Sequence, residues 1–219
     1  IKAQLSRFID FNSTASNAAI MLNNYDWMKQ FSFLDFIREI GKHITVNYMM
    51  AKDSVKKRLS SESAQGMSFT EFTYQLVQGY DFLHLRKNYG CMLQMGGSDQ
   101  WGNITSGTEL GRRRYDVELF GFTSPIITDS SGKKMGKSEG NAVWINEEKL
   151  PAYNYYQYFR NIGDAEVGKC LRIYTDLPLD EIRRLESLKD QEINEAKKIL
   201  AFEATRICRG EEEARLAQE

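Results

Sequence analysis

The stretch Leu93-Gln94-Met95-Gly96-Gly97-Ser98-Asp99-Gln100-Trp101-Gly102-Asn103 decides the fold. The apolar run Cys91–Met95 has the length of a short strand and ends at the glycine pair. Ser98 or Asp99 is in position to cap a helix that continues to about Arg113. Ligands of α/β proteins bind at the carboxyl ends of the strands, and helix N-termini favour anions. The stretch therefore predicts an α/β sheet with a ligand site at the glycines.

Several side chains of this stretch suit a nucleotide. Asp99 can accept hydrogen bonds from ribose hydroxyls, and Gln100 offers both a donor and an acceptor. A glycine at position 97 allows close approach of a ligand to the backbone. The alternative is a simple turn with Asp99 as the helix cap. That alternative explains Asp99 but not Gln94, because an amide in an apolar strand needs a partner when it is buried.

A helix precedes this strand and carries three polar groups on one face. The pattern predicts a helix over Phe69–Leu85, and Tyr74, Gln78 and Asp81 follow the spacing i, i+4, i+7. A phenol, an amide and a carboxylate on one face could hold the ammonium and a second polar group of a small ligand. A solvated helix face is the other interpretation, which the spacing alone favours.

A lysine-rich segment follows, Gly132-Lys133-Lys134-Met135-Gly136-Lys137-Ser138. Ammonium groups neutralise charge that develops on transferring phosphoryl oxygens, so Lys134 and Lys137 suit a loop that meets phosphates. The segment does not fit G-x-x-x-x-G-K-[ST], so it is not a P-loop. A solvated hairpin turn with surface lysines is an equal alternative from this segment alone.

The remaining pattern divides the chain into two parts. The first part has expected helices over Phe33–Ile40, with Gly41 as C-cap, and over Val46–Leu59, and an expected strand over Ser124–Thr128. From Pro151 onward the pattern is helical, over Tyr153–Phe159, Leu179–Leu188 and Gln191–Cys208. A βα-rich part followed by a helical part predicts an α/β fold with a helical tail.

Composition excludes several classes of protein. The 219 residues are 42% hydrophobic and 27% charged, with a net charge of -1, so any RNA contact must use a local patch or a further part of the protein. Cys91, Cys170 and Cys208 fit no zinc or disulfide pattern, and we interpret them as reduced thiols of a cytoplasmic protein. His43 and His84 have no metal-binding neighbours in the sequence, so we expect no metal site. No apolar run reaches membrane-spanning length, and we expect no signal peptide.

Taken together, three segments resemble one family in order and spacing. Lys134-Met135-Gly136-Lys137-Ser138 resembles the KMSKS signature of class I aminoacyl-tRNA synthetases, with Gly in the third position. Gly96 to Thr105 and the face of Tyr74, Gln78 and Asp81 resemble the bacterial-type tyrosyl-tRNA synthetases. The resemblance implies the second half of a Rossmann-like nucleotide-binding catalytic domain in residues 1–145, followed by an α-helical domain in residues 146–219.

The resemblance also implies a role for each site residue. Asp81 accepts a hydrogen bond from the phenolic hydroxyl of tyrosine. Gln100 lies near the carboxyl group of tyrosine and the α-phosphate of ATP. Tyr74, Gln78 and Gln94 contact the α-amino group of tyrosine. Gly97 and Asp99 contact the ribose of the adenylate. The loop with Lys134, Met135, Lys137 and Ser138 closes on the pyrophosphate, with Lys134, Lys137 and Ser138 as the catalytic set. The implied substrates are L-tyrosine, ATP with Mg²⁺ and tRNA(Tyr), without a tightly bound cofactor.

One family motif is absent, and other readings stay open. Neither His43 nor His84 sits in an H-x-G-H pattern, so we expect this chain alone to be weakly active or inactive. Residues 23–60 match the connective insertion of the family, which implies a homodimer, and ordinary core packing is an equal interpretation of their apolar residues. We expect no membrane partner, since no apolar run is long enough to span a bilayer. The first alternative is a tryptophanyl-tRNA synthetase. The second is a non-catalytic, synthetase-like RNA-binding protein.

Overall fold

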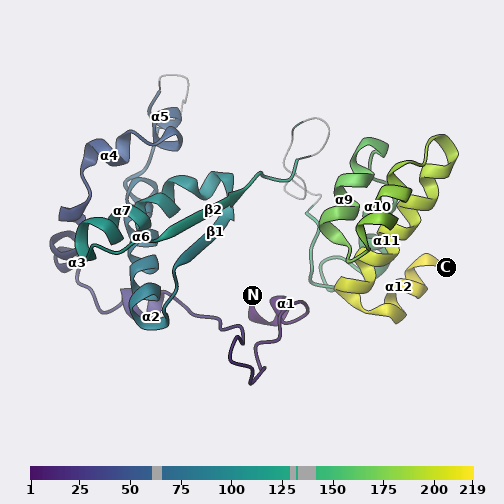
Figure 1. Ribbon diagram of the computed structural model, residues 1–219, viewed down its shortest axis with the longest axis horizontal. Helices are drawn as coiled ribbons and strands as arrows, with labels where there is room; N and C mark the ends of the chain where they lie inside the picture. Colours follow the sequence, from purple (N-terminus) through teal and green to yellow (C-terminus); the bar gives the residue numbers. More distant parts are fainter. Residues whose placement is uncertain (61–65, 129–131, 133–141) are drawn as a thin grey trace. The chain divides into compact units, whose positions relative to one another are not determined.

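The computed structural model describes residues 1–60, 66–128, 132 and 142–219 (Figure 1). Contacts divide the chain into two compact units. The α/β unit comprises Leu22–Ile126, and the helical unit comprises Ile1–Met21 together with Ile127–Glu219. The domain boundary at residues 145/146 stays a prediction. No helix among the described residues is long and apolar enough to cross a bilayer.

A small parallel sheet organises the α/β unit. Strand β1 (Leu93–Gly97) pairs in parallel with β2 (Phe120–Ser124), and α7 (Trp101–Tyr115) forms the connection (Figure 1). The predicted strand over Cys91–Met95 is therefore correct in kind but begins two residues later. The prediction of a strand over Ser124–Thr128 is wrong, since β2 ends at Ser124. Pro125 follows and has no N–H to donate to a ladder, which explains the end of the strand.

Helix α6 (Phe69–Tyr89) packs along α7. The helix begins at a capping box formed by Ser68 and Glu71, and it ends at Gly90, whose φ of 70° is left-handed. The predicted helix is confirmed and extends one turn beyond Leu85. Where the two helices meet, a Cβ on Gly107 would lie 2.8 Å from the ring of Phe82. The glycine therefore sets how closely α6 and α7 approach.

Short helices precede α6. They are α2 (Tyr25–Met28), α3 (Phe33–Glu39), the 3-10 helix η1 (Gly41–His43), α4 (Val46–Met50) and α5 (Asp53–Leu59). Gly41 starts η1 and does not cap α3, so that prediction is wrong. The single predicted helix over Val46–Leu59 is also wrong. Lys52 is extended, with ψ of 135°, because its side chain turns toward α7 and binds the carbonyl of Gly102 at 2.9 Å.

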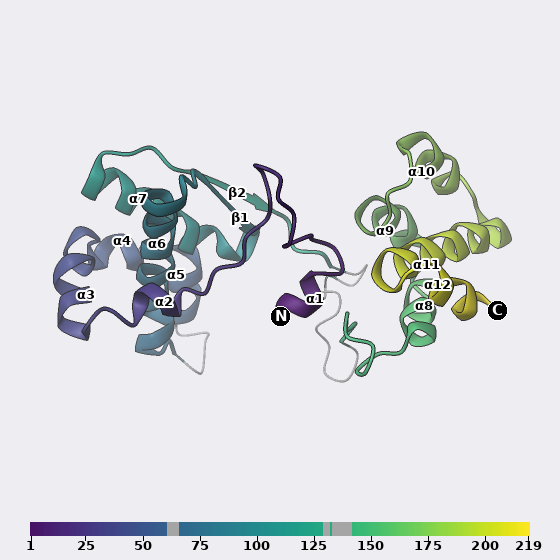
Figure 2. The ribbon, with the colours of Figure 1, turned by 90° about the horizontal axis from the view of Figure 1, so that it is seen from below.

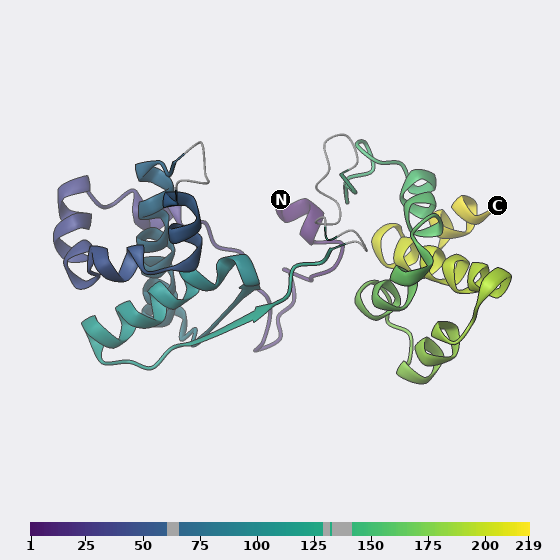
Figure 3. The ribbon, with the colours of Figure 1, turned by 90° about the horizontal axis from the view of Figure 1, so that it is seen from above.

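The helical unit confirms the expectation for residues after Pro151. It contains α1 (Lys2–Leu5), α8 (Ala152–Arg160), α9 (Val167–Tyr174), α10 (Leu179–Glu186), α11 (Ile193–Arg209) and α12 (Glu211–Gln218). Helix α11 contacts α8, α9, α10 and α12, and Figures 2 and 3 show it passing through the middle of this group. Its core includes Phe159, Leu171, Leu185 and Leu200, all at most 2% exposed.

Candidate functional site

The polar face of α6 is present as predicted. Tyr74 is 55% exposed, whereas Gln78 and Asp81 are partly buried. Two side chains at helix α2 hydrogen-bond the carboxylate of Asp81. Its Oδ1 accepts a hydrogen bond from Trp27 Nε1 at 2.7 Å, and its Oδ2 accepts one from Asn24 Nδ2 at 3.0 Å. A carboxylate offers about four acceptor positions, so Asp81 retains capacity for a further donor such as a phenol.

Trp27 and Asn24 hydrogen-bond the predicted site residue Asp81, and the sequence analysis did not single them out. Trp27 is 8% exposed, and its ring stacks on His84 with centroids 4.2 Å apart and planes 14° apart. Burial lowers the pKa of His84 against the opposing effect of Asp81. The stack fixes the direction of the indole N–H and therefore the orientation of Asp81. The only sequence signal was the run Asn23-Asn24-Tyr25-Asp26-Trp27, which has no helical or strand periodicity.

The glycine pair lies within β1 rather than after it. Ser98–Gln100 forms the 3-10 helix η2, and α7 begins at Trp101. The prediction that Ser98 or Asp99 caps the helix is wrong, because neither η2 nor α7 has a side-chain cap. A Cβ at position 97 would lie 2.8 Å from Oδ1 of Asp99. The conformation of this turn therefore requires a glycine at position 97, whether or not a ligand is bound.

Gln94 and Gln100 flank this glycine turn. Oε1 of Gln94 is buried and has no hydrogen-bond partner among the described residues. Such an atom costs free energy unless a donor reaches it, so it marks a place where a ligand ammonium would be stabilised. Gln100 is partly buried, and its Oε1 accepts a hydrogen bond from Asn103 Nδ2 at 3.4 Å.

The structure thus brings two groups of predicted residues into one compact unit. The first lies on α6 (Tyr74, Gln78 and Asp81), and the second lies on β1 and η2 (Gln94, Gly97, Asp99 and Gln100). Lys134, Met135, Lys137 and Ser138 lie outside the described residues. Within the described ranges there is no group of three His, Cys, Asp or Glu side chains that could hold a metal ion.

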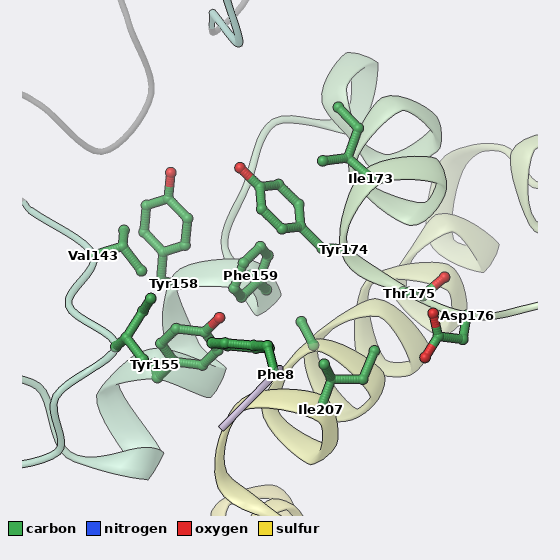
Figure 4. A pocket seen from close by; sticks show the side chains of 12 residues that line it. Phe8, Val143, Tyr155, Tyr158, Phe159, Ile173, Tyr174, Thr175, Asp176 and Ile207 are labelled. Atoms are coloured by element: carbon green, nitrogen blue, oxygen red, sulfur yellow. The ribbon is translucent and has the colours of Figure 1, made fainter. Parts of the chain in front are cut away.

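A separate cavity of about 570 Å³ lies in the helical unit. Aromatic rings dominate its wall, and Figure 4 shows the hydroxyls of Tyr158 and Tyr174 pointing to the same side of Phe159. Asp176 is the one acidic residue among the described residues that line it. None of the predicted site residues on α6, β1 and η2 lines this cavity, so it is distinct from those two groups.

Comparison with known proteins identifies the family. The family model for tRNA synthetases class I (W and Y) matches residues 1–219. The chain belongs to the class I tRNA synthetases (W and Y). This membership confirms the family resemblance from which the site residues were predicted.

Curated relatives to which the chain is similar include tyrosine--tRNA ligases. The chain is 54% identical over 218 residues to that of Wolbachia sp. subsp. Drosophila simulans, covering 100% of the chain and 52% of the relative. It is 60% identical over 187 residues to that of Porphyromonas gingivalis strain W83, covering 85% of the chain and 44% of the relative. The chain therefore spans about half the length of the curated relatives it matches.

Two solved structures have a fold similar to that of this chain. The C-terminally truncated mitochondrial tyrosyl-tRNA synthetase of Aspergillus nidulans aligns with a TM-score of 0.77 at 29% identity, covering 100% of this chain and 64% of that one. The corresponding Coccidioides posadasii structure gives a TM-score of 0.72 at 30% identity, covering 90% of this chain and 56% of that one. The α/β unit with its small parallel sheet and the helical unit thus belong to the class I synthetase fold.

Proposed function

We propose that this chain is part of a tyrosine--tRNA ligase, which activates L-tyrosine with ATP and transfers it to tRNA(Tyr). The observation that carries the proposal is the identity of 54% to 60% with tyrosine--tRNA ligases of two bacterial groups. The carboxylate of Asp81, held by Trp27 and Asn24, adds a local reason for tyrosine over tryptophan. An ionised carboxylate accepts the phenolic O–H of tyrosine directly.

In the first step the carboxylate of tyrosine attacks the α-phosphate in line, and pyrophosphate leaves. No side chain of the protein forms a covalent bond to the substrate in this step, so catalysis rests on positioning and on stabilisation of charge. Tyr74, Gln78 and Gln94 hold the α-amino group in this proposal. Gly97 and Asp99 bind the ribose, and Gln100 lies near the reacting carboxyl group.

In this proposal the lysine-rich segment Gly132–Ser138 binds the phosphates of ATP. Lys134, Lys137 and Ser138, with Met135 between them, close on the pyrophosphate. Mg²⁺ enters with ATP and is bound mainly through phosphate oxygens and water. We further propose that residues 1–145 form the second half of a Rossmann-like catalytic domain and residues 146–219 an α-helical domain. A cytoplasmic location stays a prediction.

A homodimer is part of the proposal. Five apolar side chains of α3 and α4 are between 40% and 77% exposed: Phe33, Leu34, Ile37, Val46 and Met50. These residues fall within the segment 23–60 that the resemblance assigns to the dimer interface, and exposed apolar side chains there are consistent with a protein contact.

The test is tyrosine-dependent ATP–pyrophosphate exchange. Because the chain spans half of its relatives, it is assayed alone and as a chimera in which it replaces the corresponding 218 residues of the Wolbachia protein. We expect exchange by the chimera with tyrosine, and little with tryptophan or phenylalanine. A folded chimera that exchanges with tryptophan instead, or with no amino acid, would overturn the proposal.

A further inference from the structure

Lys52 joins the α4–α5 junction to the start of α7. Its Nζ donates hydrogen bonds to the carbonyl of Gly102 at 2.9 Å and to Oγ1 of Thr105 at 2.7 Å. A third bond goes to Oη of Tyr48 at 3.0 Å. A lysine ammonium has three donors, so this side chain is fully engaged. Two of its three acceptors belong to the first two turns of α7.

The junction also packs closely on that turn. A Cβ at position 102 would lie 3.4 Å from Oγ of Ser54 and 3.8 Å from Cδ of Lys52. Tyr48 adds a second link, because its hydroxyl donates to the carbonyl of Thr105 at 3.1 Å. The ammonium of Lys52 lies 4.3 Å from the centroid of the Tyr48 ring. The two residues therefore act as one clamp on α7.

The opposite side of the same turn packs on the sheet. A Cβ on Gly121 of β2 would lie 2.7 Å from Cγ2 of Ile104, and one on Gly96 of β1 would lie 3.0 Å from Cβ of Gln100. The start of α7 is thus held between the two strands and Lys52. The segment Ser98–Gln100 leads directly into this turn, so its position depends on both contacts.

The carbonyl of Gly102 does not depend on Lys52 for a hydrogen bond. It also accepts from Oγ of Ser106 at 2.9 Å and from Oγ1 of Thr105 at 3.2 Å. Burial lowers the pKa of Lys52 to about 8, with Glu109 opposing, so the fold bears a desolvation cost to keep an ammonium here.

We propose that Lys52 is a positioning residue for tyrosine activation, which holds Ser98–Gln100 in place by clamping the first turns of α7. The inference rests on the proposed function, in which Asp99 and Gln100 contact the adenylate. Lys52 itself touches no substrate. Its removal therefore affects the activation step and leaves the tyrosine-binding face of α6 unchanged.

Kinetics of the chimera test this role. We expect Lys52→Met to lower kcat of tyrosine-dependent pyrophosphate exchange by about tenfold, since small misplacements of substrate-positioning groups have effects of this order or larger. The dissociation constant of tyrosine stays within twofold of the parental value. Lys52→Arg, which keeps a cation, recovers part of kcat. The matched control is Lys56→Met on the exposed side of α5, which leaves both values unchanged.

Hydrogen exchange on the chain itself tests the geometry independently of activity. We expect Lys52→Met to speed exchange of the amides of residues 104–107 in α7 and to leave those in the middle of α6 unchanged. Unchanged exchange in α7, or an unchanged kcat in a folded Lys52→Met chimera, would contradict the proposal. An inactive parental chimera would instead contradict the proposed function and the catalytic part of this inference. The exchange measurement would still decide whether Lys52 holds α7.

Discussion

Trp27 donates its indole N–H to Oδ1 of Asp81 at 2.7 Å, across 54 positions of sequence. The tryptophan is buried and stacked on His84, so its N–H has a fixed direction. Asp81 is thereby oriented before any substrate arrives, with Asn24 holding its second oxygen. Preorganised acceptors of this kind lose little freedom on binding a ligand, which favours recognition of a single hydroxyl.

Trp27→Phe tests this orientation. Phenylalanine keeps an aromatic ring against His84 and removes only the donor to Asp81. Hydrogen bonds to charged groups contribute about 1.5–3 kcal/mol, so we expect KM for tyrosine in pyrophosphate exchange to rise about tenfold or more. Trp144→Phe, at an exposed tryptophan of the helical unit, is the matched control and leaves KM unchanged. An unaltered KM in Trp27→Phe would show that Asp81 needs no support from the indole.

Asp81→Ala tests the acceptor itself. We expect the variant to lose its preference for tyrosine over phenylalanine, because no acceptor remains for the phenolic hydroxyl. The substitution also leaves Nε1 of Trp27 without its partner, which costs roughly 1–3 kcal/mol of stability. The ratio of kcat/KM for the two amino acids measures selectivity, and circular dichroism with a thermal melt verifies the fold. A folded variant that rejects phenylalanine as strongly as the parent refutes the role of Asp81.

Gly107→Ala tests the contact between α6 and α7. The new Cβ would lie 2.8 Å from the ring of the fully buried Phe82, so a core side chain or the helix itself must shift. Overpacking of this kind costs about 1–3 kcal/mol, and we expect a lower Tm for the chain. The control is Gly41→Ala, whose Cβ would meet only Ile37 at 3.7 Å, an ordinary contact. Equal melting temperatures for the two variants would be inconsistent with this packing.

Local patterns predicted the parts of the fold that depend on neighbours in sequence. The strand near Leu93, the helix over Phe69–Leu85 and the helices α8, α10 and α11 follow from periodicity, whereas both predicted helix caps were wrong. The break at Lys52 did not follow from periodicity, because its cause is a contact with Gly102, 50 positions away. The role of Trp27 was not predicted either, because it depends on a contact with Asp81, 54 positions away. Recognition of the family supplied the proposed roles of Tyr74, Gln78 and Asp81, which spacing alone assigned to a solvated face.

Leu34→Glu tests the proposed dimer. Leu34 is 77% exposed on α3, so a charge there leaves the fold of the isolated chain intact. In a dimer interface the same charge would be buried without a partner, which is strongly unfavourable. We expect light scattering at micromolar concentration to show a dimer for the parent and a monomer for the variant. Leu216→Glu, 60% exposed on α12, is the control and stays dimeric. A monomeric parent would remove the dimer from the proposal.

The pKa of Lys52 makes stability depend on pH in a defined window. Burial lowers this pKa from 10.5 to about 8 in the folded chain. Between these values the unfolded chain binds a proton that the folded chain has released, so the unfolding free energy rises with pH. The destabilising effect of burying the ammonium is complete below pH 8 and has disappeared above pH 10.5. At 1.36 kcal/mol per pKa unit the total gain is at most about 3 kcal/mol, and solvent screening reduces it.

Urea unfolding of the chain at pH 7.5, 9 and 10 measures this effect. Other lysines and the tyrosines also titrate here, so the quantity of interest is the difference between the parent and Lys52→Met. We expect the parent to gain stability relative to Lys52→Met as pH rises, because only the parent carries the depressed group. Lys56→Met, at an exposed position, should follow the parent at every pH. A constant difference between the parent and Lys52→Met would mean that the ammonium is as well solvated in the fold as in the unfolded chain.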